Sequence, residues 1–167
     1  MKTKYPIKQI QTGMNNPILR NISEEIQEIT QEVVEFCHKL MLLMWQHKGV
    51  WLAAPQVGEN IRIIATSQRE KKRTKDKLLS ETIMINPNII ETSKESIVRE
   101  EACISLPNCT GTVKRHKNIT VEFMDITGKK HTKKYKEFNA VIIQHEIDHL
   151  DWVLFMDKIT KKSKKTT

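Results

Sequence analysis

The chain is poor in glycine and in aromatic residues, and it has no long apolar run. Only 5 of its 167 residues are glycine and 5% are aromatic, whereas glycine makes up about 7% of an average protein. No apolar stretch approaches the roughly 18 residues that a membrane-spanning helix needs. The lysine-rich start of the chain also lacks the apolar core of a signal peptide. We therefore predict a cytoplasmic protein that does not enter a membrane.

The cysteines do not form the pattern of a disulfide framework. Cys37, Cys103 and Cys109 are odd in number and contain no C-x-x-C spacing, so metal binding or catalysis by one of them stays open. We expect Cys37 in the core, because it lies on the apolar stripe of a predicted helix.

The formal net charge of +8 is typical of a protein with an anionic partner, such as nucleic acid, the ribosome or a membrane surface. A charged surface that only keeps the protein soluble explains it equally well. Residues 69–77 carry six basic side chains, and we interpret them as an exposed loop. The length predicts a single domain over residues 1–167, with a flexible basic tail from about residue 159.

Apolar periodicity predicts an α+β fold, with antiparallel sheets packed around a C-terminal helix. A long N-terminal amphipathic helix of about twenty residues is expected from Ser23, its N-cap, to Gly49. Residues 99–107 are expected in a loop or at the end of a strand. The expected strands are 61–65, a pair at 83–87 and 89–90 separated by a turn, and a hairpin of 119–123 with 133–135.

The pattern H-E-x-x-H occupies residues 145–149, in an apolar stretch that is predicted to be helical. Residues four apart share one face of an α-helix, so His145 and His149 can bind the same metal ion. The carboxylate of Glu146 would lie within reach of a metal-bound water and can accept its proton. The pattern therefore predicts metal-assisted hydrolysis, with a third ligand from elsewhere in the chain.

Cys103 is a good candidate for that third ligand, because acidic residues flank it in a segment that is not helical. Cys109 is the competing candidate, and the residue chemistry alone does not separate the two. A thiolate and two imidazoles leave the fourth position of a tetrahedral ion open for water, as in catalytic rather than structural sites.

Three ordered motifs resemble those of the peptide deformylase family. They are GVWLAAPQ at residues 49–56, EACIS at 101–105 and QHEIDH at 144–149, beside the family patterns G-x-G-x-A-A-x-Q, E-G-C-x-S and Q-H-E-x-D-H. The similarity extends over roughly residues 10–160. Ser105, Gln144 and Arg115 also match the family pattern, and Asp148 is expected to make either a hydrogen bond behind a ligand or an ion pair.

The resemblance implies a metal-dependent hydrolase that removes formate from N-formylmethionine at the start of nascent polypeptides. Cys103, His145 and His149 would bind the metal, and Glu146 would be the general acid and base. The Gln56 side-chain amide and the Ile104 backbone N–H would stabilise the oxyanion. The family commonly uses Fe²⁺, with Zn²⁺, Ni²⁺ or Co²⁺ as substitutes.

A methionine side chain needs an apolar pocket, which Val141, Ile142 and Phe138 can supply from the turns before His145. The full set of expected substrate-binding residues is Val50, Trp51, Glu101, Ala102, Phe138, Val141 and Ile142. The expected partners are formylmethionyl peptides and, through weak electrostatic contact, the ribosome surface. We expect a monomer without sequence-specific nucleic-acid binding.

The chain departs from the family pattern at Trp51, Ala102 and Trp152, where the family has glycine. One hypothesis is that UGA codons, which some bacteria read as glycine and others as tryptophan, underlie both tryptophans. The alternative function is a deformylase-like protein that binds metal and peptide but turns over poorly, because Trp51 narrows the cleft. A third hypothesis, an endopeptidase, gives no role to Cys103 or Gln56.

Overall fold

The computed structural model describes residues 4–47, 49, 51–67 and 81–162. Val50, the basic segment 69–77 and the last residues of the tail lie outside this range. The described elements are α1 Gln31–Gln46, β1 Trp51–Ala53, the 3₁₀-helix η1 Ala54–Val57, β2 Ile63–Ser67, β3 Glu81–Thr92, β4 Ser96–Cys103, β5 Leu106–His116, β6 Asn118–Met124, β7 Lys130–Lys136, α2 Glu137–Leu150, the 3₁₀-helix η2 Phe155–Lys158 and β8 Ile159–Lys162.

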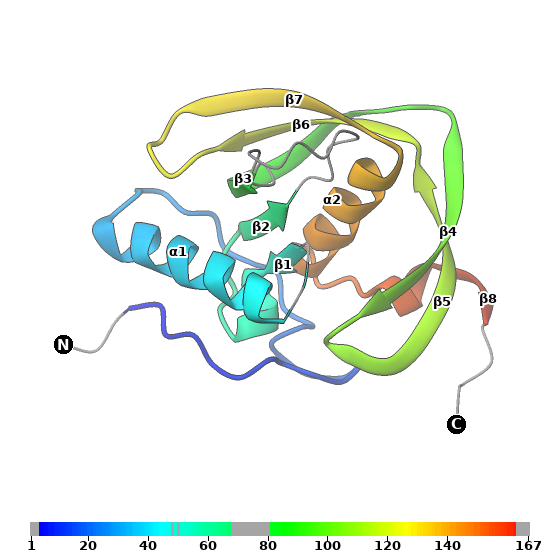
Figure 1. Ribbon diagram of the computed structural model, residues 1–167, viewed down its shortest axis with the longest axis horizontal. Helices are drawn as coiled ribbons and strands as arrows, with labels where there is room; N and C mark the ends of the chain where they lie inside the picture. The colour runs from blue at the N-terminus through cyan, green and yellow to red at the C-terminus, as the bar shows by residue number, and fades with distance from the viewer. Residues whose placement is uncertain (1–3, 48, 50, 68–80, 163–167) are drawn as a thin grey trace, which may run out of the picture.

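The described strands form two antiparallel sheets, which confirms the predicted α+β class. One sheet has the order β1-β2-β3-β6-β7 and the other the order β4-β5-β8. Helix α2 lies between them, packed against β1, β2, β6 and β7 on one side and β5 on the other (Figure 1). Neither of the two α-helices in the described ranges is long and apolar enough to cross a membrane.

Helix α1 is shorter than predicted, and Ser23 is not its N-cap. The helix begins after Thr30, whose hydroxyl accepts a hydrogen bond from the Val33 N–H at 3.4 Å. The preceding segment is held extended by tertiary bonds, since the Asn86 side chain bonds both the N–H and the C=O of Ile26. Ile26 is therefore buried from an irregular segment, although its spacing fits the helical stripe. Cys37 is fully buried in the core, as predicted.

One strand prediction is also wrong. Residues 83–87 and 89–90 belong to one strand, β3, which passes through Asn86 at a φ of 51° with shifts in its register against β6. Residues 99–107 include the end of a strand, one of the two predicted options, because β4 ends at Cys103 and forms a long hairpin with β5 that turns at Ile104 and Ser105. The predicted hairpin of residues 119–123 and 133–135 is confirmed as β6 and β7.

Strand β2 separates two apolar cores by simple alternation. Ile63 and Ala65 face the core under α1, whereas Ile64 faces the core under α2. All three side chains are fully buried. The sheet is thus covered by α1 on one face and by α2 on the other. The packing of α2 against its face sets the positions of His145 and His149.

An early segment of the chain anchors the end of α2. The Ser23 N–H donates to the Leu150 carbonyl at 2.8 Å, and Ile22 bridges to Asp151. Arg20 binds the Asp157 carboxylate through two nitrogens at 2.6 and 3.0 Å. These contacts fix the C-terminal turn of α2, which carries His149.

Trp152 occupies the position after the α2 C-cap, where glycine is usual. Its φ is 60°, and the Val153 N–H bonds the Asp148 carbonyl at 2.9 Å, as in a Schellman motif. A side chain in this left-handed region is strained, and the indole is 51% exposed, so packing compensates little. This conformation supports the hypothesis that a UGA codon stands for glycine here.

We expect Trp152→Gly to stabilise the protein by about 1 kcal/mol, which raises the melting temperature by roughly 2–4 °C for a chain of this size. Trp45→Gly is the matched control, because Trp45 is also exposed but lies inside α1. There glycine should cost about 1 kcal/mol. A lower melting temperature for Trp152→Gly would contradict the assignment of strain to this residue.

Candidate metal centre

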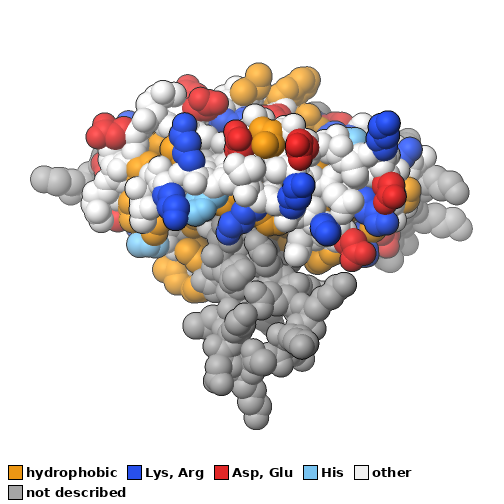
Figure 2. Space-filling model, turned by 90° about the horizontal axis from the view of Figure 1, so that it is seen from above, with side chains coloured by type: hydrophobic (Ala, Val, Ile, Leu, Met, Phe, Trp, Pro, Cys, Tyr) orange, Lys and Arg blue, Asp and Glu red, His pale blue; other side chains and the backbone are white. Residues whose placement is uncertain are grey.

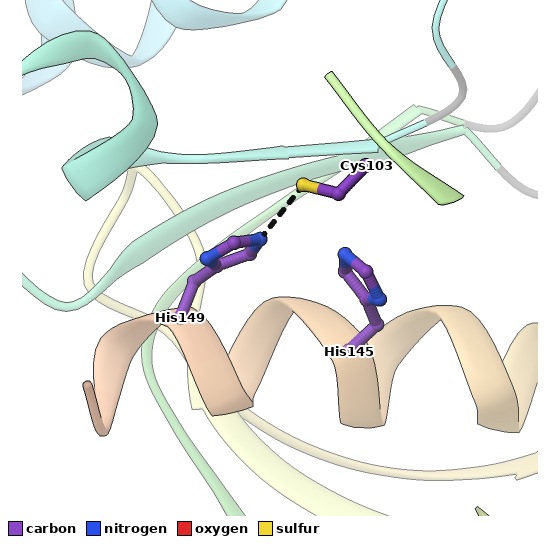
Figure 3. Close-up of side chains that lie close together, drawn as sticks. All are labelled: Cys103, His145 and His149. Atoms are coloured by element: carbon purple, nitrogen blue, oxygen red, sulfur yellow. Dashed lines mark hydrogen bonds between the residues drawn. The ribbon is translucent and has the colours of Figure 1, made fainter. Parts of the chain in front are cut away.

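Cys103 and the two histidines of the H-E-x-x-H pattern meet in one buried cluster. Their ligand atoms all lie within 4.8 Å of one another, and the Cys103 Sγ is 3.3 Å from the His149 Nε2. Figure 3 shows both imidazoles rising from α2 toward the sulfur, which β4 brings in at its last residue. Cys109, the competing candidate, lies further along β5 and is not part of the cluster.

The cluster fits a divalent metal ion. The His145 Nδ1 bonds the Glu101 carboxylate at 2.8 Å, which assigns the ring proton to Nδ1 and leaves the Nε2 lone pair for a ligand. Within the described residues, this buried Nε2 and both buried oxygens of Glu146 have no hydrogen-bond partner. Sulfur and imidazole donors suit ions such as zinc and iron, and three protein ligands leave a position for a reactant.

Burial sets the protonation of the ligands. Burial, with the Glu146 carboxyl nearby, raises the pKa of the Cys103 thiol to about 12. Burial and the neighbouring His145 hold the pKa of His149 well below its usual value, so its ring is neutral. A neutral imidazole is ready to bind metal, whereas the thiol must lose its proton, so metal binding should release a proton.

Glu146 is a buried carboxyl beside the cluster. It is fully buried, and one of its oxygens lies 3.9 Å from the His145 Nε2. Burial raises its pKa well above the ordinary value, and the charge of Glu101 adds to this effect. A carboxyl with a raised pKa holds a proton more readily than an exposed one, which suits a group that must accept a proton and return it, as general acid–base catalysis requires.

A chain of charges holds His145 from behind. Arg115 binds the two oxygens of Glu101 at 2.8 and 2.9 Å and also pairs with Asp148, which in turn binds Lys158. Burial raises the pKa of Glu101, but hydrogen bonds from Arg115 and His145 outweigh it, so the pKa falls to about 2. Asp148 makes an ion pair, one of the two predicted options.

Gln56 and the β4–β5 turn lie next to the sulfur of Cys103. The Gln56 carbonyl oxygen accepts from the Ala53 N–H at 2.9 Å, which points its Nε2 at the Cys103 Sγ and the Ser105 hydroxyl, 3.3 and 3.2 Å away. Gln56 is buried, whereas the Ile104 side chain is exposed next to Cys103. The Gln56 amide is therefore a fixed donor beside the cluster.

A pocket of about 200 Å³ opens beside His145. Most of the predicted substrate-binding residues line it, namely Trp51, Glu101, Ala102, Phe138, Val141 and Ile142. Three further residues also line it: Arg99, Glu100 and His145. Val50, also predicted, lies outside the described residues. Arg99 was not predicted to line the pocket, although it lies two residues before Glu101 and would have followed from recognising β4 as a strand.

Known proteins resemble this chain over nearly its whole length. The family model described as polypeptide deformylase matches residues 7–165. The peptide deformylase of Halothermothrix orenii is 37% identical over 93% of this chain and 96% of its own. A probable peptide deformylase from Synechococcus phage S-SSM7 has a similar structure, with a TM-score of 0.82 and 35% identity over 92% of this chain and 100% of that one. The Met-Ala-Ser-bound enzyme from Acinetobacter baumannii gives a TM-score of 0.83 and 28% identity over 93% and 99%.

Proposed function

Because the chain belongs to the polypeptide deformylase family, we propose that Cys103, His145 and His149 hold its divalent metal ion and that Glu146 moves the protons of the reaction. The activity is that of a peptide deformylase, a hydrolase that removes the formyl group from formylated peptides. The observation that supports these roles best is the buried cluster of sulfur, imidazole and unpartnered carboxyl oxygens.

We propose Fe²⁺ as the resident ion, with Zn²⁺, Ni²⁺ or Co²⁺ able to replace it, since thiolate and imidazole ligands suit all four. Bound in this set, the ion would supply Lewis acidity, which lowers the pKa of water toward neutrality and polarises a carbonyl group. Glu101 orients His145 for this role by holding its Nδ1 proton.

Glu146 provides the proton transfers. Its raised pKa lets it accept a proton from the attacking water and return it to the departing amine, so that formate and a free N-terminus result. Because the carboxyl is fully buried, it exchanges its proton with the reactants rather than with bulk solvent. Its oxygens, which have no hydrogen-bond partner among the described residues, would be free to contact both reacting groups.

Gln56 and Ile104 would stabilise the negative charge that develops on the formyl oxygen. The Gln56 amide is already held by the Ala53 N–H, so it needs no reorganisation to donate from Nε2. The Ile104 N–H belongs to the residue directly after the sulfur ligand, at the β4–β5 turn. Both donors would thus border the same reacting oxygen.

The pocket beside His145 would receive the methionine side chain. Phe138, Val141 and Ile142 supply apolar walls from α2, and Ala102 leaves the β4 side open. The alternative in which Trp51 prevents turnover is not favoured, because the pocket persists next to the indole and the relatives are named peptide deformylases. Membership of the family also disfavours an endopeptidase.

The proposed partners are formylmethionyl nascent chains, met in the cytoplasm by a monomer that contacts the ribosome weakly. The predicted contacts, residues 69–77 and the tail, lie largely outside the described residues. Strand β7 offers a further basic surface, because Lys130, Lys133, Lys134 and Lys136 are all exposed on it. Figure 2 shows basic side chains spread over the face that carries β6 and β7, with acidic ones between them. Such a surface favours weak, salt-sensitive contact with an anion.

The proposed function is tested by anaerobic assay of the Fe²⁺-loaded protein with formyl-Met-Ala-Ser, measuring released formate. We expect turnover that is lost when the metal is chelated and restored by Fe²⁺. Release of formate that is unaffected by chelation would contradict a metal-dependent reaction. Absence of formate with every metal tried would contradict the function itself.

A further inference from the structure

Arg99 is an exposed cation at the rim of the methionine pocket. Its guanidinium carbon lies 5.5 Å from the centroid of the Phe138 ring, and Trp51 packs edge-on against the same ring at 6.0 Å. None of the ion pairs between described residues involves Arg99. A guanidinium stacked on a ring keeps its N–H donors free at its edge, in the fork that matches a carboxylate.

Arg99 lies on the same face of β4 as Cys103 and Glu101. Cys103, Glu101 and Arg99 are each two residues apart on the same strand, so their side chains share one face. The first two are buried at the metal cluster. Arg99 follows about 13 Å from Cys103 along the strand, at about 3.3 Å per residue.

Strands β1 and β4 are edge strands of their sheets, and both supply residues to the pocket. An extended peptide can follow such an edge through main-chain hydrogen bonds. In an extended peptide the first and third side chains point to the same side, about 7 Å apart. With methionine in the pocket, the third side chain of a peptide that follows β4 away from Cys103 therefore reaches the guanidinium of Arg99.

We propose that Arg99 is a specificity-determining residue that favours aspartate or glutamate at the third position of the formylated peptide. The proposal rests on the proposed function, which places methionine in the pocket. Glu101 does not compete for Arg99, because Arg115 and His145 occupy its carboxylate. Glu100 is the opposing charge, because it is exposed and also lines the pocket.

The test compares kcat/KM for formyl-Met-Ala-Glu and formyl-Met-Ala-Gln. At low salt we expect the acidic peptide to be favoured about 3- to 5-fold, the range of a partly exposed ion pair, with less preference at high salt. Arg99→Gln should bring the ratio to about 1. Lys39→Gln, which removes an exposed charge on α1, should leave the ratio unchanged, and Glu100→Gln should raise it. A preference that persists in Arg99→Gln, or no preference in the wild type, overturns the proposal.

Measuring peptide affinity distinguishes a failure of the proposed role of Arg99 from a failure of the proposed function. The affinities of metal-loaded protein for the product peptides Met-Ala-Glu and Met-Ala-Gln, measured by calorimetry, should differ by a similar factor and depend on Arg99. If no peptide releases formate, the proposed function fails and this affinity ratio alone decides the role of Arg99. If all peptides release formate at equal rates and the affinities are equal, only the role of Arg99 fails. Glutamate at the second position should bring no advantage: formyl-Met-Glu-Ala should not be favoured over formyl-Met-Gln-Ala, because the second side chain points away from Arg99.

Discussion

Glu146→Gln is expected to reduce kcat for formate release by about 10²- to 10⁴-fold, the usual contribution of a general acid–base group. Glutamine keeps the shape of the side chain but cannot carry the proton between water and the departing amine. Steady-state assays with formyl-Met-Ala-Ser measure the loss. Metal content, measured on the same samples, should stay at the wild-type level, because Glu146 is not one of the three clustered ligands.

A control variant and a stability measurement make the test of Glu146 specific. Glu95→Gln changes an exposed carboxylate far from the cluster and should leave kcat unchanged. The metal-free Glu146→Gln protein should unfold no more easily than metal-free wild type at neutral pH, since burial of an ionised Glu146 is unfavourable. A variant with wild-type kcat and full metal content would show that another group moves the protons.

Arg115→Met is expected to destabilise the protein by about 3–5 kcal/mol, the usual effect of leaving a buried carboxylate without its partner. Arg115 is 4% exposed and holds both Glu101 and Asp148. Because Glu101 orients His145, metal affinity should also fall by roughly 10- to 100-fold. Chemical denaturation and competition with a chelator measure the two effects.

The controls for Arg115→Met lie on the same strand and in the same network. Lys114→Met removes the exposed neighbouring charge and should change stability little. Adding Glu101→Gln to Arg115→Met should restore part of the lost stability, because the unpaired carboxylate is gone. No restoration would mean that Arg115 acts mainly through packing.

The effect of Arg115→Met should depend on pH in one direction. The pKa of Glu101 is lowered to about 2 from 4.5, so its ion pair contributes fully above pH 4.5 and is lost as the pH falls toward 2. The stability difference between wild type and Arg115→Met should therefore narrow over that interval in the metal-free protein. Unfolding curves at several acidic pH values measure it.

The sequence predicted what depends on local spacing. His145, Glu146 and His149 share one helical turn, so their geometry follows from periodicity alone. Cys103 lies on a different element, at the end of strand β4, and only the tertiary fold brings it to the helix. Its choice over Cys109 needed a family resemblance, because chemistry made the two cysteines equivalent.

The wrong predictions arose where distant partners decided the local structure. A helical apolar stripe runs through Ile26, yet the Asn86 side chain holds its backbone extended. Strand β4 was not predicted from the sequence, because the positions that face the site carry Arg99 and Glu101 rather than apolar residues. Those charges serve the site, so the alternation that normally reveals a strand was absent.

The anchor between the early segment and the end of α2 has a consequence for the order in which the site forms during synthesis. Arg20 and Asp157 are 137 residues apart in the chain, and Ser23 must find Leu150. During synthesis the N-terminal part leaves the ribosome first, so the early segment cannot make these contacts until Leu150 and Asp157 have emerged. The last turn of α2, which carries His149, is therefore anchored only after the segment that contains Asp157 has been made.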